Sequence, residues 1–340
     1  MHLTATGGKR VSIWIWLLLG VALVLVAGFI YEQIGAARAA IRYPAPGRLI
    51  DIGGRRLHLL CKGEDHGKAG PTVVLETGAI TPGLMWARVQ DAVAGFSRVC
   101  LYDRAGYGWS DPASGERSVE QRVQELHTLL HKADVPQPYV LVGHSYGGIM
   151  ARIYARNYRD EVAGMVLVDS AEEGVHLRPD VLSLYSKMLR VMAVMGAISR
   201  FGLWRFWQPL ALDADSGFSL QVRSALNALM LRHDSSKAGR DEIESLERDA
   251  PALTALGAAG SLGSLPLVVI NHGKPFPGPF AVLENYWGDG QKRLAALSSR
   301  GELIVAEAAS HNILVESPDV IVAAIRRVVD AARMVDPPPT

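Results

Sequence analysis

The sequence predicts an α/β fold in which a mainly parallel β-sheet is covered by helices on both faces. Short apolar runs that end at glycine, such as 72–78 and 139–143, are typical of buried strands. Between them, residues 119–130 place apolar side chains at helical spacing. Strands that alternate with helices favour a parallel sheet between two helical layers.

Composition narrows the classes of function. The 340 residues are 49% hydrophobic and 20% charged, which excludes a largely disordered chain. The formal net charge is +1 and the sequence has no basic stripe, so no nucleic-acid partner is expected. The sequence also shows no Cys, His or carboxylate residues at the spacings of a metal-binding motif, and no nucleotide-binding glycine loop. It therefore implies no cofactor and no metal.

The first part of the chain, 1–46, is interpreted as a transmembrane anchor and linker. Residues 11–31 carry no charge and match the ~20 apolar residues that a helix needs to cross a bilayer. The two basic residues before this run favour an inside N-terminus and a main domain outside the cytoplasm, although Arg38 and Arg42 weaken that bias. A signal peptide cleaved near 37–39 and a soluble core helix are the alternatives.

The elements after the linker can be placed in order. A hairpin is expected at 47–63, with its turn at Gly53 and Gly54. Strands are expected within 71–78, 97–111, 139–148, 162–170, 265–273 and 303–306. Helices are expected within 118–135, 149–158, 181–210 and 220–233, and from Pro318 onwards with Ser317 as the cap.

The stretch GHSYG at 143–147 has the spacing Gly-x-Ser-x-Gly. When such a stretch follows a strand and precedes a helix, the serine sits on a strained turn with its hydroxyl exposed. Both elements are predicted here, so Ser145 is the candidate nucleophile. A serine hydroxyl needs a base to take its proton, and His311 is the candidate base, in a loop after the last strand. His144 is expected to be a structural hydrogen-bonding residue.

Three motifs follow one another, each at the end of a predicted strand. They are YDRAGYGWSD at 102–111, GHSYGG at 143–148 and AASHNILVESPDV at 308–320. In these motifs the chain resembles the α/β-hydrolase fold superfamily. The resemblance implies a serine hydrolase of esterase or lipase type, with a core formed by 47–170 and 264–335. It also implies a helical lid at 171–263, where methionine and aromatic residues indicate an apolar pocket.

The resemblance also implies the remaining site residues. Many relatives carry the triad acid after the strand that follows the lid, but no carboxylate stands close after Gly273. The acid is therefore assigned to Asp169, one strand earlier, as in the lipase branch of the fold. The alternatives are Glu172, Glu173, Glu284 and Asp289. The oxyanion hole is expected to use the backbone N–H groups of Tyr146 and of Ala79, which follows Gly78.

The favoured reaction is two-step acyl transfer on a small carboxylic ester with an apolar portion. An amidase, a thioesterase, a carbon–carbon bond hydrolase and a cofactor-free haloperoxidase-like enzyme would use the same residues. Dehalogenases and epoxide hydrolases of the superfamily carry aspartate where Ser145 stands, which disfavours those activities. A catalytically idle, membrane-tethered binding protein is the alternative from another class.

The two cysteines, Cys61 and Cys100, fall on strands that are neighbours in this fold. Cross-strand residues in a favourable register approach closely enough for a disulfide, and a domain outside the cytoplasm permits one. A Cys61–Cys100 disulfide is therefore predicted, with two buried free thiols as the alternative.

Overall fold

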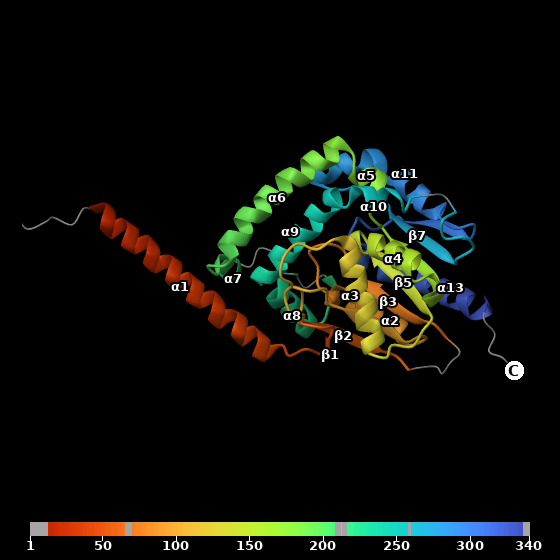
Figure 1. The fold of residues 1–340 in the computed structure, drawn as a ribbon, viewed down its shortest axis with the longest axis horizontal. Coiled ribbons are helices and arrows are strands. Elements are labelled where there is room, and N and C mark those ends of the chain that lie inside the picture. The colour runs from red at the N-terminus through yellow and green to blue at the C-terminus, as the bar shows by residue number, and fades with distance from the viewer. Residues whose placement is uncertain are drawn as a thin grey trace, which may run out of the picture.

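The computed structural model describes residues 13–64, 70–207, 212, 216–230, 232–257 and 260–335. At its centre is an eight-stranded sheet with the order β1-β2-β4-β3-β5-β6-β7-β8 (Figure 1). β2 runs antiparallel to both of its neighbours, and the strands from β4 to β8 are parallel to one another. The strands are β1 (Arg48–Asp51), β2 (Arg56–Lys62), β3 (Thr72–Glu76), β4 (Val99–Tyr102), β5 (Tyr139–His144), β6 (Val162–Val168), β7 (Leu267–His272) and β8 (Gly301–Ala306).

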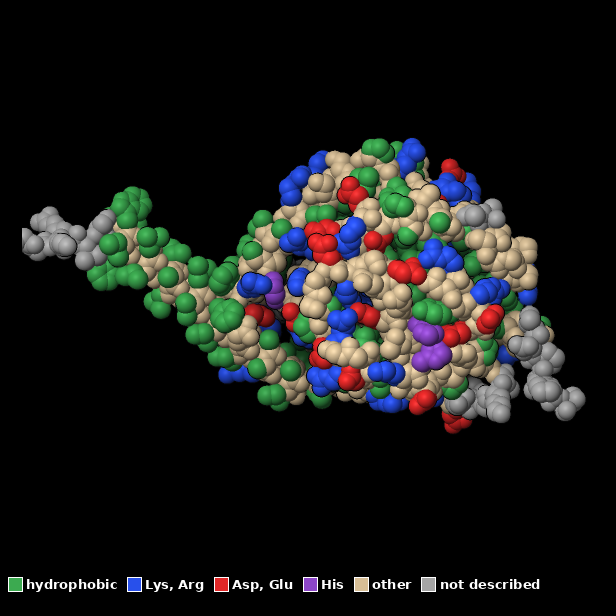
Figure 2. All heavy atoms as spheres, viewed as in Figure 1, with side chains coloured by type: hydrophobic (Ala, Val, Ile, Leu, Met, Phe, Trp, Pro, Cys, Tyr) green, Lys and Arg blue, Asp and Glu red, His purple; other side chains and the backbone are tan. Residues whose placement is uncertain are grey.

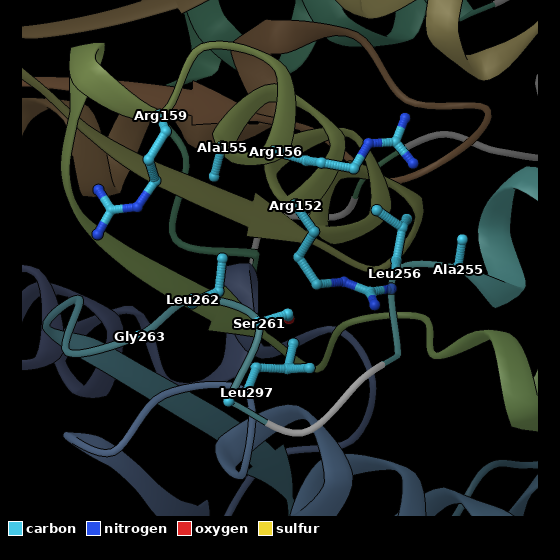
Figure 3. Close-up of a pocket in the computed structure, with 11 residues that line it drawn as sticks. Arg152, Ala155, Arg156, Arg159, Ala255, Leu256, Ser261, Leu262, Gly263 and Leu297 are labelled. Carbon is cyan, nitrogen blue, oxygen red and sulfur yellow. The ribbon is translucent and has the colours of Figure 1, made fainter.

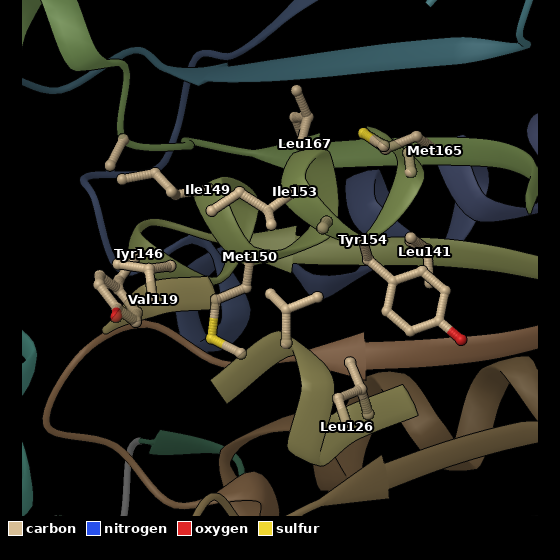
Figure 4. Packing of buried hydrophobic residues seen from close by; sticks show 14 of the residues in the cluster. Val119, Leu126, Leu141, Tyr146, Ile149, Met150, Ile153, Tyr154, Met165 and Leu167 are labelled. Carbon is tan, nitrogen blue, oxygen red and sulfur yellow. The ribbon is translucent and has the colours of Figure 1, made fainter. Parts of the chain in front are cut away.

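Helices cover both faces of this sheet, so the predicted α/β class is confirmed. Leu141 belongs to the buried cluster on one face, and Val140 and Val142 belong to the cluster on the other, because successive strand residues point to opposite faces. Figure 4 shows the first cluster, in which side chains of α3, α4 and the sheet meet. That face carries α3 (Val119–Lys132), α4 (Tyr146–Asn157) and α11 (Glu284–Ala295), and the opposite face carries α2 (Ala87–Val93) and α13 (Pro318–Val335).

A helical insertion joins β6 to β7. Its helices are α5 (Glu173–His176), α6 (Pro179–Ser199), α7 (Leu203–Trp207), α8 (Leu220–Met230), α9 (His233–Arg248) and α10 (Ala250–Thr254). The helix expected across 181–210 is divided, because Gly202 adopts a φ of 71° and turns the chain between α6 and α7. Residues 208–210 of that expected helix lie outside the described residues.

Short helical turns complete the described chain. They are η2 (Gly83–Trp86), η3 (Arg159–Glu161), η5 (Gly278–Leu283) and α12 (Ile313–Glu316). The sequence pattern did not predict α12, which is a single turn directly before α13.

The N-terminal apolar helix is present as α1 (Ile13–Arg42), which projects from the globular body (Figure 1). Figure 2 shows apolar side chains along the projecting part. In the described part of the chain, two helices, α1 and α6, are by length and composition apolar enough to cross a membrane. The apolar stretch of α1 is not buried against the protein at all, whereas 17% of the corresponding stretch of α6 is buried. The described part of the expected run 11–31 begins at Ile13.

The predicted disulfide is present in the structure. Cys61 of β2 and Cys100 of β4 are direct register partners in adjacent antiparallel strands. Their sulfur atoms are bonded to each other, across a sequence separation of 39 residues. The strand order that the resemblance implies therefore brings the two cysteines together.

Candidate active site

Ser145 lies in the turn between β5 and α4, with φ 51° and ψ −119°. This is a strained conformation for a residue other than glycine. A Cβ on Gly143 would lie 2.5 Å from the carbonyl oxygen of Gly147, and a Cβ on Gly147 would lie 2.5 Å from the carbonyl oxygens of Glu76 and Thr77. Glycine is therefore needed at both places for this turn to close, as the sequence motif predicts.

His311 and Asp169 are brought together from distant parts of the chain. Asp169 follows β6 directly and is fully buried, with a φ of 43°. His311 lies between β8 and α12, and its Nδ1 atom is 2.6 Å from Oδ2 of Asp169. Both residues follow strands of the parallel part of the sheet, so their strands end at the same edge. Ligands of α/β proteins bind outside this edge.

The Asp169 carboxylate is held by further donors. Its Oδ1 accepts hydrogen bonds from Nε1 of Trp287 at 2.8 Å and from the backbone N–H of His272 at 3.1 Å. Its Oδ2 also lies 2.6 Å from Nδ1 of His272. Burial alone would raise the pKa of the Asp169 carboxyl, but hydrogen bonds from His272 and His311 lower this pKa well below its usual range. Asp169 is therefore ionised at neutral pH.

His272 is a site residue that the sequence pattern did not reveal. It is the last residue of β7, directly before the segment in which the acid of many relatives was expected. A histidine was not considered there because only carboxylates were expected. Its Nε2 lies 2.9 Å from Oε1 of Glu284. A continuous series of contacts thus runs from Glu284 through His272 and Asp169 to His311. Burial lowers the pKa of His272, but its bonds to Asp169 and Glu284 outweigh this and raise the pKa overall.

The other carboxylates weighed as the acid have different partners. Glu284 contacts His272, as described above. The remaining pairs are Glu172 with Arg293 at 2.7 Å, Glu173 with Arg152 at 2.8 Å, and Asp289 with Lys292 at 2.9 Å. Within the described chain, Asp169 is the one of the five weighed carboxylates that contacts His311.

His144 supports the loop that carries His311. Its Nε2 lies 2.9 Å from the backbone carbonyl oxygen of His311. Burial, with the nearby His311, lowers the pKa of His144 to about 3. The ring is therefore neutral at physiological pH, and its proton is on Nε2, where it donates to this carbonyl. His144 is thus a hydrogen-bonding residue, as expected from the sequence.

The two expected oxyanion residues, Ala79 and Tyr146, line one cavity together with Ser145 and His311. The cavity has a volume of about 450 Å³. Its walls are mostly apolar and come from the loop after β3, from the insertion and from the segment after β7. The apolar lining includes Tyr185, Met188, Ile243, Phe276, Phe280 and Trp287. An apolar pocket with a few convergent polar groups suits a small organic ligand.

Arg104 fixes the backbone of the loop that contains Ala79. Its guanidinium donates hydrogen bonds to the carbonyl oxygens of Thr77 at 2.9 Å and Gly78 at 2.7 Å. It also pairs with the buried Glu76 and, at 2.7 Å, with Glu242 of α9 in the insertion. The conformation of this loop is therefore tied to the docking of α9, a contact that no local sequence pattern indicates.

A second cavity, of about 410 Å³, lies away from Ser145 and includes three arginines, Arg152, Arg156 and Arg159, in its lining (Figure 3). These side chains point in different directions in Figure 3. Arg152 is paired with Glu173 and Arg156 with Glu120, each at 2.8 Å. The cavity therefore does not focus positive charge on one point.

Among the residues that the structure describes, two groups of side chains have the donor atoms that metals prefer. Asp169, His272 and His311 form one group, and His127, His131 and Glu161 form the other. Within each group the ligand atoms lie within 4.8 Å of one another. A metal in the first group would replace the hydrogen bonds that orient His311. The second group lies outside the cavity that holds Ser145.

A family model described as the alpha/beta hydrolase fold matches residues 71–273. The chain belongs to the alpha/beta hydrolase fold family. This membership supports a hydrolase as the class of enzyme and confirms the family resemblance seen in the sequence motifs.

Curated relatives of this alpha/beta hydrolase include the uncharacterized protein YqjL of Bacillus subtilis. It is 37% identical over 105 residues, which are 31% of this chain and 42% of that protein. The chain spans between 19% and 53% of the length of the first curated relatives that it matches.

Solved structures with a similar fold include an esterase from Thermogutta terrifontis, with a TM-score of 0.59 and 21% identity over 82% of this chain and 94% of that one. A putative epoxide hydrolase from Pseudomonas aeruginosa has a TM-score of 0.63 and 19% identity over 84% and 96%. At this level of identity the likeness concerns the fold.

Proposed function

We propose that this alpha/beta hydrolase is a serine hydrolase that cleaves a carboxylic ester with an apolar portion. The observation that carries the proposal is the 2.6 Å contact between Asp169 and His311, at the cavity that also receives Ser145 on its strained turn. Asp169 would be the acid that orients the imidazole, His311 the base and Ser145 the nucleophile.

The proposed reaction has two steps. The Ser145 hydroxyl oxygen attacks the ester carbonyl carbon while Nε2 of His311 takes the hydroxyl proton. The negative oxygen that forms accepts hydrogen bonds from the backbone N–H groups of Tyr146 and Ala79. Collapse expels the alcohol, which leaves with the proton from His311. Water then attacks the acyl-enzyme with His311 as the base, which releases the acid and restores Ser145.

An apolar ester is favoured over other substrates because of the cavity lining. Aromatic and aliphatic side chains predominate around Ser145, and burial of apolar surface contributes about 25 cal/mol per Å². The serine hydroxyl distinguishes this site from that of relatives that use an aspartate nucleophile. The helices between β6 and β7 contribute Tyr185 and Met188 to the wall, so the insertion at 171–263 is proposed as the lid of a core formed by 47–170 and 264–335.

We also propose that α1 anchors the protein in a membrane as a single span, with the hydrolase domain outside the cytoplasm. The exposed apolar surface of α1 supports the anchor. The Cys61–Cys100 disulfide supports an oxidising compartment. Fractionation tests the anchor: the full chain should sediment with membranes, and a chain that begins at Gly47 should be soluble and active. Intact full-length protein in the soluble fraction would contradict the anchor.

A panel of esters with increasing acyl length tests the activity. Purified protein should hydrolyse them, with a preference for apolar acyl or alcohol groups, and Ser145→Ala should remove the activity. Amides and thioesters of the same acyl groups, run in parallel, separate the alternatives that share these residues. Failure to hydrolyse any of these compounds, with the fold intact by circular dichroism, would favour a binding protein.

A further inference from the structure

The end of the insertion nearest α1 exposes a group of apolar side chains. On α7, Phe206 and Trp207 are 82% and 78% exposed. Monomeric proteins seldom leave large aromatic side chains together in water without a reason. We call this group the α6–α7 patch; it consists of Val191, Val194, Leu203, Phe206 and Trp207.

The same segment packs against α1 where the apolar run of α1 ends. Glu32 of α1 is buried and makes a two-pronged ion pair with Arg205 of α7, with distances of 2.8 and 3.0 Å. A Cβ on Gly28 would lie 2.7 Å from the carbonyl oxygen of Phe201 in the α6–α7 turn. The backbones of α1 and the turn therefore approach closely. Figure 1 shows α7 and the adjoining end of α6 beside α1, away from the sheet.

These contacts fix the depth of the patch relative to a bilayer. If the uncharged part of α1 crosses the hydrocarbon, Glu32 marks the level of the headgroups, because it is the first charged residue after the run. The ion pair with Arg205 places α7 at that level. Tryptophan and phenylalanine suit this zone, since their apolar bodies enter the acyl region.

We propose that the α6–α7 patch is seated in the surface of the phospholipid bilayer that α1 crosses, and that the enzyme takes its apolar substrate from that lipid phase. The proposal rests on the proposed membrane anchor and ester hydrolase activity. α6 connects the two sites, because its first half supplies Tyr185 and Met188 to the cavity that holds Ser145 and its second half leads to α7. One helix thus joins the membrane surface to the wall of the substrate cavity.

A site-specific probe tests the seating. Both cysteines of the chain are in the disulfide, so Phe206→Cys provides a single reactive thiol for an environment-sensitive NBD label. Met334→Cys is the matched control, since Met334 is apolar, 80% exposed and on α13. Each full-length labelled protein is reconstituted into phosphatidylcholine vesicles that contain some phosphatidylglycerol, and flotation confirms that it is anchored.

In floated vesicles, the label at 206 should show a blue-shifted emission that lipids with a doxyl group near the headgroup quench. The label at 334 should remain water-like and unquenched. A water-like label at 206 in anchored protein would overturn the proposal. A blue shift without quenching by doxyl lipids would also overturn it, because the patch would then be covered by protein, such as a second copy of the chain. Absence of flotation would reject the anchor, and the seating with it.

The double variant Phe206→Ser and Trp207→Ser tests the supply of substrate. Hydrolysis of a long-chain ester dissolved in the vesicles should fall by about tenfold or more, since each aromatic side chain contributes at least that factor to partitioning. Hydrolysis of a water-soluble short-chain ester should not change. If the substitution changes the rate of hydrolysis of neither ester, the proposal that substrate comes from the lipid phase is overturned. Loss of activity toward both esters would also overturn it. If the unsubstituted protein hydrolyses neither ester, the proposed function fails, while the probe experiment still decides the seating.

Discussion

His311 and Asp169 are 142 residues apart in the chain and meet with Nδ1 2.6 Å from Oδ2. The contact depends on two parallel strands that end at the same edge of the sheet, one before the insertion and one after it. The contact occupies Nδ1 of His311, and His311 lines the same cavity as Ser145. In the proposed mechanism, Nε2 is therefore the ring nitrogen that acts as the base.

Substitutions of Ser145, His311 and Asp169 should lower kcat by different factors. Ser145→Ala and His311→Ala should each lower kcat by at least about 10³-fold, because nucleophile and base act as a unit. Asp169→Asn should lower kcat by about 10²-fold or more, through loss of imidazole orientation. Asp289→Asn is the control, since Asp289 is exposed and paired with Lys292. Full activity of Asp169→Asn together with loss in Asp289→Asn or Glu172→Gln would overturn the assignment of the acid.

His272 should act as a positioning residue through Asp169. In His272→Phe the carboxylate loses a donor, so the pKa of Asp169 rises from its depressed value toward the usual range. A less firmly held carboxylate should orient the His311 imidazole less well, so kcat should fall while KM changes little. His58→Phe is a matched control, because His58 is also buried beside an aspartate, 2.8 Å from Asp103, outside the lining of the cavity.

Both histidine variants should lose about 1–3 kcal/mol of stability, as expected when a buried charged acceptor loses its partner. The kinetic constants distinguish them. An equal fall of kcat in both variants, or no fall in His272→Phe, would show that the contact with Asp169 has no role beyond stability.

The site illustrates what sequence patterns can and cannot predict. Ser145 and its glycines were predictable because the constraint is local: a tight turn between a strand and a helix leaves no room for a Cβ. The approach of Asp169 to His311 was predictable only with the strand order that the family resemblance supplied. His272 was not predicted, because its role arises from a neighbouring strand and its residue type differs from the expected acid.

The insertion was the least predictable part for a related reason. Helical periodicity across 181–199 continues into 203–207, and the break depends on the positive φ of one glycine, Gly202. Glu242 likewise looks like an ordinary polar residue of an amphipathic helix. Its contact with Arg104 exists only once α9 has docked on the loop after β3.

Removal of the disulfide should destabilise the domain. In the double variant Cys61→Ala and Cys100→Ala, the free energy of unfolding should fall by about 2–4 kcal/mol, because the denatured chain gains conformational freedom. Denaturant melts in the presence and absence of reductant measure this. Non-reduced, alkylated protein from its native compartment should show no modified cysteine by mass spectrometry. Two alkylated thiols would reject the bridge and weaken the proposed location outside the cytoplasm.

His176 should make the folded protein less stable as the pH falls below 6.5. Burial lowers the pKa of His176 from 6.5 to about 4, so between these pH values the unfolded chain binds a proton that the folded chain does not. The contribution of His176 to the free energy of unfolding is therefore complete above pH 6.5. Below that pH it is lost by about 1.4 kcal/mol per pH unit, down to about pH 4. His176→Gln should therefore flatten the fall of the unfolding midpoint between pH 6.5 and about 4. Identical slopes for both proteins would contradict this role.

The most direct test of the central claim is the mass of the protein after reaction with a fluorophosphonate, which forms a covalent bond with an activated serine. One adduct per chain is expected, on the peptide that contains Ser145, and no adduct in Ser145→Ala or His311→Ala. Hydrolysis of esters by a protein that remains unmodified, or an adduct on a serine other than Ser145, would contradict the claim.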